Sequence, residues 1–182
     1  MQLIVIRHGE TVMNRDNRLQ GSKGPNEGLT EDGRKMVVKL RDELLVTPET
    51  MYVSPLARTQ ETADIINERF HVPIVLVPEI VERDFGSLSG KLRNEIDPAI
   101  VESDLEGRYD YHRFGGESVD DVRARIVKFL GSLPLATERT VFVITHRGVV
   151  RVLYDLFPNN VSGEEVVPAS KHVFNVTKLP EQ

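Results

Sequence analysis

Two apolar runs in this chain end in the same residue types, a histidine and an arginine followed by a glycine. The run at 3–6 leads into Arg7-His8-Gly9, and the run at 141–145 leads into His146-Arg147-Gly148. An imidazole can act as a nucleophile or exchange a proton, and a guanidinium group binds oxyanions through several N–H donors. Together these groups suit phosphoryl transfer, which depends on positioning and on compensating the charge of the phosphoryl oxygens.

A third arginine is expected at the same place because of a helix start. Ser54 is predicted to cap a helix whose first residue is Pro55, which puts Arg58 in the first turn. Amide groups at a helix N-terminus also favour an anion. The sequence has no Walker-type glycine loop and no aspartate-rich metal motif, so the arginines would take the part that Mg²⁺ plays elsewhere. We therefore predict a site without a metal or a cofactor.

Elements of alternating type must hold these residues in place. Strands are predicted at 2–6, 50–53, 73–77, 140–145 and 172–179, and helices at 30–45, 55–70, 118–130 and 148–157. This alternation predicts an α/β fold, a three-layer αβα sandwich around a mostly parallel central sheet. In such a sheet ligands bind beyond the carboxyl ends of the strands, so the two histidines are expected to face one pocket.

Two further predictions concern the second helical region and a polar segment. Thr30 is expected to cap the helix at 30–45. Its apolar face is predicted to consist of Met36, Val37, Leu40 and Leu44. Residues 87–116 are irregular and polar, which predicts a loop or a small cap. With 182 residues the chain is long enough for one domain and short for two, so we expect a single domain at 1–182.

Composition argues against several classes of partner. The chain has 23 basic and 28 acidic residues, a net charge of −5, and no lysine- and arginine-rich run, so we expect no nucleic acid or membrane partner. The absence of cysteine excludes disulfides and a thiolate nucleophile. No signal-peptide pattern or membrane-length apolar run is present, which predicts a cytoplasmic protein. The expected partner is a small-molecule phosphate ester, and a homodimer is left open.

Five ordered blocks of sequence resemble the histidine phosphatase superfamily, the phosphoglycerate mutase-like proteins. They are RHGETVMN at 7–14, SPLARTQET at 54–62, VERDFGSLSG at 81–90, GGESVDDVRARIVKFL at 115–130 and THRGVVR at 145–151. The resemblance runs from Leu3 to about Val152, and VFNVTKL at 173–179 is similar to the family's closing strand. It implies a phosphoglycerate mutase-like fold and a member of the phosphatase branch.

The resemblance also implies catalytic roles. His8 resembles the phosphorylated nucleophile of the family, and Arg7, Arg58 and His146 resemble the pocket that holds the transferring group. Glu82 matches the general acid, which would protonate the leaving oxygen and then deprotonate water. That role needs a protonated carboxyl near neutral pH, so burial or the substrate dianion is expected to raise the pKa of Glu82.

Five more residues are candidates for substrate binding. By resemblance, Asn14, Gln20 and Gly21 match positions that contact phosphate or substrate. Arg83 is a candidate for the substrate mouth. Arg147 stands where the family commonly has a small residue, and it could add a substrate contact or crowd the pocket. The neighbouring cations could also line this mouth, but an exposed polar loop is the simpler interpretation for most of them; they are Lys91, Arg93, Arg108, His112 and Arg113.

The strand-end residues also have plainer interpretations. Arg7 and His8 could form a surface turn that pairs with Glu10, and Arg58 could pair with Glu61 on the surface of a helix.

His146 and Glu82 are open to plainer interpretations as well. His146 alone could be a hydrogen-bonded core residue. Glu79 and Asp84 lie close to Glu82 in the sequence, and only the family pattern selects Glu82 among them.

Three functions remain open. The leading hypothesis is a metal-independent phosphomonoesterase that hydrolyses small phosphorylated metabolites through a phosphohistidine intermediate. A cofactor-dependent phosphoglycerate mutase must exclude water under a longer insertion, whereas only residues 91–115 fill that interval here, which favours hydrolysis. A phospho-ligand binding protein without catalysis is the third interpretation. Met13, where the family usually has an aromatic, and the unusual run GSKGPNEGLT at 21–30 bear on substrate preference.

Overall fold

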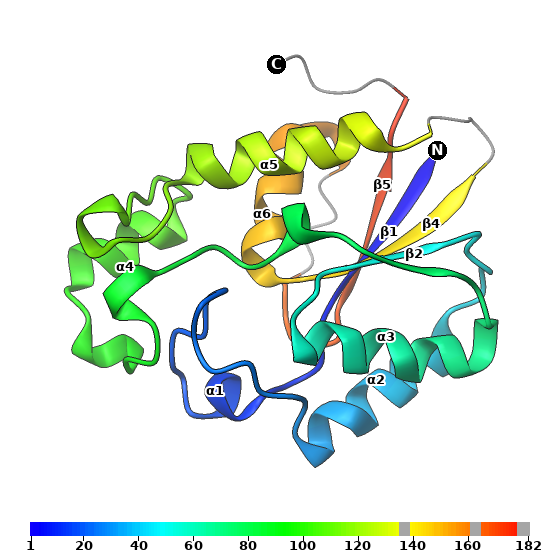
Figure 1. Ribbon diagram of the computed structural model, residues 1–182, viewed down its shortest axis with the longest axis horizontal. Helices are drawn as coiled ribbons and strands as arrows, with labels where there is room; N and C mark the ends of the chain where they lie inside the picture. Colours follow the sequence, from blue (N-terminus) through cyan, green and yellow to red (C-terminus); the bar gives the residue numbers. More distant parts are fainter. Residues whose placement is uncertain (135–138, 161–164, 178–182) are drawn as a thin grey trace.

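The computed structural model describes residues 1–134, 139–160 and 165–177. Within these residues the centre is a five-stranded sheet in the order β3-β2-β4-β1-β5 (Figure 1). The strands are β1 (Gln2–Arg7), β2 (Met51–Val53), β3 (Ile74–Leu76), β4 (Thr140–Thr145) and β5 (Lys171–Asn175). Neighbouring strands are parallel except for β1 and β5, which are antiparallel. The predicted α/β fold with a mostly parallel sheet is confirmed.

The two central strands, β1 and β4, bring the two histidine motifs together. They pair in parallel, in a register that sets Arg7 beside Thr145. All residues of β1 after Gln2 and all residues of β4 after Thr140 are buried, as parallel strands covered on both faces should be. Because both strands run in the same direction, His8 and His146 follow them at the same edge of the sheet.

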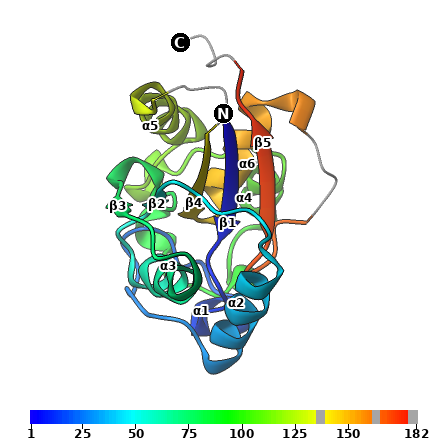
Figure 2. The same cartoon turned by 90° about the vertical axis from the view of Figure 1, so that its right-hand side faces the viewer.

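Two pairs of helices cover the two faces of the sheet (Figure 2). The helices are α2 (Glu31–Glu43), α3 (Ala57–Phe70), α5 (Val119–Ser132) and α6 (Arg147–Leu156). Side chains of a strand alternate between its faces, so Ile4 and Ile6 pack in the core under α2 and α3, whereas Leu3 and Val5 pack in the core under α5 and α6. This arrangement confirms the three-layer sandwich.

The start of α3 differs from the prediction that Ser54 caps a helix at Pro55. The helix begins at Ala57, and its N-cap residue, Leu56, makes no side-chain capping bond. The Ser54 hydroxyl lies 2.7 Å from Nε2 of His146 instead, so a polar partner in the site competes with the capping role. Arg58 still lies in the first turn, as predicted.

The other differences lie at the surface of the fold. Thr30 caps α2 as predicted, but Met36 is exposed, whereas Val37, Leu40 and Leu44 are buried. A short helix, α1 (Val12–Arg15), follows the first histidine motif and was not predicted.

The segment at 87–116, here called the cap, is more regular than predicted. It contains α4 (Pro98–Leu105), which begins with a proline and has Asp97 as its N-cap. The cap lies beyond the carboxyl ends of β1 and β4 (Figure 1). It is therefore placed to border any ligand that binds at that edge.

The last strand and the helices complete the comparison with the sequence. β5 lies at the edge of the sheet, and Lys178 and Leu179 of the predicted strand lie outside the described residues. None of the described helices is long and apolar enough to cross a membrane. The single domain at 1–182 stays a prediction.

Candidate active site

One pocket gathers almost all of the residues singled out in the sequence. Its lining residues are Arg7, His8, Asn14, Arg18, Gln20, Gly21, Arg58, Glu82, Arg83, Phe85, Arg93 and Arg147. All predicted site residues except His146 belong to this lining. The pocket lies at the carboxyl ends of β1 and β4, where an α/β sheet binds ligands.

His8 presents one ring nitrogen to this pocket. Its Nδ1 lies 2.7 Å from the carbonyl oxygen of Gly9, and a carbonyl only accepts, so Nδ1 carries the hydrogen. Burial, together with the charges of Arg58 and Arg7, holds the pKa of His8 well below its usual value. The imidazole is therefore neutral, and Nε2 keeps the lone pair that a nucleophile needs.

His146 lies beside His8, beneath the pocket. The two ring centroids are 5.2 Å apart, and His146 is fully buried. Its Nε2 bonds to Ser54, while Nδ1 is buried and has no hydrogen-bond partner among the described residues. A buried polar atom without a partner is costly and calls for an explanation such as a ligand. His146 is thus hydrogen-bonded in the core, as its plainer interpretation proposed, and still has one free donor or acceptor.

Arg7 and Arg58 are fixed by backbone carbonyls. Nη1 of Arg7 donates to Val166 over 2.8 Å, and Nη2 of Arg58 donates to Gly21 over 2.9 Å. Both Nε groups are buried without a partner in the described part of the chain. Burial lowers the pKa of each arginine to about 10, with the charge of Arg147 adding to the effect at Arg7. Both side chains stay charged at neutral pH and are held ready for an anion.

The surface alternatives for these arginines do not hold. Arg58 is 1% exposed and does not pair with Glu61, which instead lies within an ion-pair distance of 2.5 Å from Arg34. The carboxylate of Glu10 accepts a hydrogen bond from Thr30.

Glu82 is held against the start of α6. Its carboxylate accepts hydrogen bonds from the amides of Arg83, over 2.9 Å, and Gly148, over 3.2 Å. A Cβ atom at Gly148 would lie only 2.2 Å from Oε1 of Glu82, so the lack of a side chain at this position lets the carboxylate approach the start of α6 this closely.

The expectation of a raised pKa for Glu82 is wrong for the protein by itself. Burial raises the pKa, but the charge of Arg83, the amides of Arg83 and Gly148, and the charge of Arg58 together lower it below its usual value. The sequence identified the carboxylate but not these compensating groups. The contribution expected from a substrate dianion stays a prediction.

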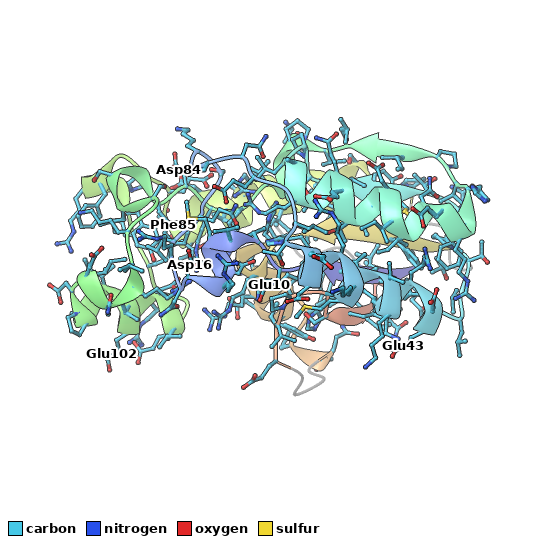
Figure 3. The ribbon with its side chains drawn as sticks, turned by 90° about the horizontal axis from the view of Figure 1, so that it is seen from below. Glu10, Asp16, Glu43, Asp84, Phe85 and Glu102 are labelled. Atoms are coloured by element: carbon cyan, nitrogen blue, oxygen red, sulfur yellow. The ribbon has the colours of Figure 1, made fainter. Side chains whose placement is uncertain are left out.

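Arg83 connects the pocket with the cap. Its Nη2 lies 2.6 Å from Asp104 of α4, and both side chains are buried. The guanidinium also lies over the rings of Phe85 and Tyr109, at 5.0 and 4.5 Å from their centroids. Figure 3 shows Asp84 and Phe85 where the cap meets the rest of the fold. Arg83 is thus a buried anchor between the two parts.

Asn14, Gln20 and Gly21 form another part of the pocket lining. The side chain of Asn14 completes a capping box with Thr11, and the Thr11 hydroxyl donates to Gln20 over 2.9 Å. Gly21 adopts a positive φ of 62° and accepts the bond from Arg58. All three residues line the pocket, as predicted.

The pocket contains two further cations, Arg18 and Arg93. Arg18 carried no signal of its own, and its Nη1 is held by the carbonyl of Gly90 over 2.8 Å. Arg93 belongs to the group of cations for most of which an exposed loop is the simpler interpretation, but it lines the pocket, 3.8 Å from Asp104, as the alternative of a substrate mouth implied. The loop interpretation is correct for Lys91, Arg108, His112 and Arg113, which are exposed. Among the described residues no group of three or more histidine, aspartate and glutamate side chains is placed to hold a metal ion.

The two buried histidines predict a loss of stability in mild acid. Burial lowers the pKa of both His8 and His146 well below 6.5, so the unfolded chain binds more protons than the folded one below that pH. Each histidine is therefore expected to cost about 1.4 kcal/mol of unfolding free energy per pH unit below 6.5. Urea unfolding at pH 7.5 and 5.5 in phosphate-free buffer measures this loss.

Two asparagine variants test the assignment of this effect. In His8→Asn the difference in unfolding free energy between the two pH values should shrink by about 1.4 kcal/mol. His71→Asn changes an exposed histidine at a left-handed position that asparagine tolerates, and it should keep the wild-type difference. An unchanged difference in His8→Asn would contradict a neutral, buried His8.

The fold and this site together define an α/β protein built to bind and transfer a phosphoryl group. The model of the histidine phosphatase superfamily (branch 1) matches residues 3–166. A metal-independent phosphoserine phosphatase of Arabidopsis thaliana is 31% identical over 96% of this chain and 76% of that protein. Phosphoserine phosphatase 1 of Hydrogenobacter thermophilus is 32% identical over 85% of this chain and 74% of its own.

Solved structures agree with these matches. The crystal structure of a phosphoglycerate mutase from Thermus thermophilus aligns with a TM-score of 0.79 and 31% identity, covering 98% of this chain and 95% of that one. The chain belongs to the histidine phosphatase superfamily. The predicted resemblance is confirmed, and so is the enzyme class, a phosphoric monoester hydrolase of the histidine phosphatase type.

Proposed function

We propose that this protein hydrolyses small phosphorylated metabolites through a phosphorylated His8 and without a metal. The observation that carries the proposal is the neutral imidazole of His8. Its Nδ1 is tied to the carbonyl of Gly9, so Nε2 faces a pocket lined by guanidinium groups. Phosphoserine phosphatases among the relatives support a small phosphate monoester as the substrate class.

The surrounding residues take the roles of a phosphoryl pocket. Arg7, Arg58 and His146 would bind the phosphoryl oxygens, which fits their buried N–H and ring nitrogen atoms that lack partners among the described residues. Glu82 would act as the general acid and then as the general base.

The remaining pocket residues would hold the substrate. Asn14, Gln20 and Gly21 would line its phosphate or its organic part, and Arg83 would keep the cap in position.

Catalysis would proceed in two displacements at phosphorus. In the first, Nε2 of His8 forms a bond to phosphorus, the ester P–O bond breaks, and Glu82 gives its proton to the leaving oxygen. In the second, the Glu82 carboxylate takes a proton from water, the water oxygen bonds to phosphorus, and the P–N bond breaks. Inorganic phosphate leaves, and the electron pair returns to Nε2 of His8.

Chelation tests the metal-independent part of the proposal. Hydrolysis of p-nitrophenyl phosphate is expected to keep its full rate in EDTA, because arginines rather than a metal compensate the phosphoryl charge. Phosphate release is measured with and without the chelator, and again after adding Mg²⁺. A loss in EDTA that Mg²⁺ restores would contradict the proposal.

A phosphoglycerate mutase is the second candidate, because a structure of that name aligns with this chain over almost its full length. The mutase would interconvert 2-phosphoglycerate and 3-phosphoglycerate, whereas the phosphatase would release phosphate without interconversion. A coupled assay on 3-phosphoglycerate that follows both products separates the two. Binding of phosphate without turnover of any ester would favour a binding protein. A cytoplasmic location is part of the proposal, and a homodimer is left open.

A further inference from the structure

The pocket holds more positive charge than a phosphate monoester needs. Its arginines are Arg7, Arg18, Arg58, Arg83, Arg93 and Arg147. Among the described residues, Glu82 is the one carboxylate in the lining, and Asp104 pairs with two of the arginines from behind. Six guanidinium groups against two carboxylates leave four positive charges, and a phosphate dianion compensates two of them. The surplus indicates a ligand with a further negative charge.

Arg147 is the cation whose position is hardest to explain by the fold. It is the first residue of α6, and a positive charge at a helix N-terminus is unfavourable. Its Nε is buried without a hydrogen-bond partner, and no ion pair joins it to a carboxylate in the described part of the chain. The carboxylate oxygens of Asp104 are already shared by Arg83, at 2.6 Å, and Arg93, at 3.8 Å.

A second, adjoining pocket shows where a further anion would lie. Arg7 and Arg147 line both pockets, and the second is completed by Arg151 and the segment 165–168. Nη1 of Arg151 donates to the backbone carbonyl of Asp104 over 3.2 Å. A carbonyl group is uncharged, so this hydrogen bond does not neutralise the charge of Arg151. Arg147 therefore lies between the phosphoryl pocket and a more open cationic space.

The arginines on this side are held close together at an energetic cost. Burial lowers the pKa of Arg147, and the charge of Arg93 lowers it further. Burial and the charge of Arg147 lower the pKa of Arg151 in the same way. Among the described residues, Glu165 is the one carboxylate that lines the second pocket. An anion bound between the arginines would relieve their mutual repulsion.

We propose that Arg147, together with Arg151, forms a second anion subsite beside the phosphoryl pocket, so that the substrate is a small phosphate monoester with a second anionic group. The inference deepens the proposed function and rests on it for the placement of the phosphoryl group at His8. A carboxylate and a second phosphate share the required chemistry, since a guanidinium group binds both through paired N–H donors.

Binding to an inactive protein tests the subsite independently of turnover. Calorimetry on His8→Asn compares 3-phosphoglycerate with glycerol 3-phosphate, which carries a hydroxymethyl group in place of the carboxylate. We expect the carboxylate to improve the dissociation constant about 10- to 100-fold, as a charge-assisted hydrogen bond should. Fructose 1,6-bisphosphate against fructose 6-phosphate makes the same comparison for a second phosphate, and the larger ratio identifies the preferred anion.

Substitution of Arg147 assigns the preference to this residue. In the double variant His8→Asn, Arg147→Gln, the ratio of dissociation constants should fall by about tenfold for the preferred pair. Arg139→Gln in the same background changes an exposed arginine that pairs with Glu49, and it should keep the ratio. Equal affinity within both pairs, or a ratio that survives Arg147→Gln, would overturn the subsite. Absence of turnover in the wild-type protein would overturn the proposed function but not this binding result.

Discussion

Replacing His8 by asparagine is expected to lower kcat for p-nitrophenyl phosphate by about 10⁴-fold or more, because the variant lacks the atom that receives the phosphoryl group. Asparagine keeps a side-chain N–H that can donate to the carbonyl of Gly9, so the effect reports on the nucleophile more than on the local backbone. Steady-state phosphate release measures the loss, and circular dichroism checks that the variant is folded.

The intermediate itself gives a second readout of the same prediction. Rapid quenching of the wild-type protein with a ³²P-labelled ester should trap an adduct that is labile in acid and stable in alkali, as a phosphorus–nitrogen bond is. The adduct should be absent from His8→Asn. His71→Asn, which changes a histidine on the protein surface, should keep both the activity and the adduct. Wild-type turnover that never yields an adduct, at any quench time, would refute the nucleophilic role of His8.

The position of His8 could be predicted because it depends on local sequence and on a general property of parallel sheets. Two apolar runs, each followed by a histidine and an arginine, already predict two strands and the residues that lie at their carboxyl ends. The parallel pairing of β1 and β4 then brings the two ends together. Arg58 was predicted correctly even though its helix begins two residues later than expected, because either start leaves it in the first turn. Such predictions tolerate errors in element boundaries.

Long-range packing explains what the sequence did not reveal. Arg93 and Arg18 enter the pocket because the cap folds back along the segment after α1, where Arg18 and Leu92 form an isolated bridge. No local pattern marks that contact. Ser54 follows the rule for a helix cap, yet it serves His146, which lies 92 positions away in the sequence. The sign of the pKa shift of Glu82 likewise depends on amides and charges that only the folded chain brings together.

Replacing Glu82 by glutamine should separate substrates by the quality of their leaving group. An alkoxide leaves poorly unless it is protonated, whereas p-nitrophenolate leaves readily without help. Loss of a general acid is therefore expected to lower kcat/KM for an alkyl phosphate by about 10²- to 10⁴-fold, and that for p-nitrophenyl phosphate by about tenfold or less. Because kcat/KM includes only the steps up to release of the first product, hydrolysis of the phosphohistidine does not contribute.

The matched control for this variant is Glu79→Gln. Glu79 lies three residues earlier and pairs with the exposed Lys128 at 2.9 Å, outside the pocket. It should leave both kcat/KM values unchanged within about twofold, since surface ion pairs contribute little. If Glu82→Gln slows the alkyl and the aryl ester by the same factor, the proton comes from another group.

The pH dependence of phosphoenzyme formation tests whether Glu82 acts as a general acid. A general acid works only below its pKa, so the rate for an alkyl ester at saturation should fall as the pH rises through the pKa of Glu82 in the complex. The protein alone holds this pKa below its usual value, mainly because of Arg83 and two backbone amides, and a bound dianion should raise it. The falling limb should therefore lie at a higher pH at saturating substrate than in kcat/KM, and it should be absent in Glu82→Gln. Rapid-quench measurements between pH 4 and 8, at saturating and at low substrate concentration, follow the falling limb in both kinetic parameters. A limb that persists in Glu82→Gln would assign the titration to another residue, because glutamine cannot ionise.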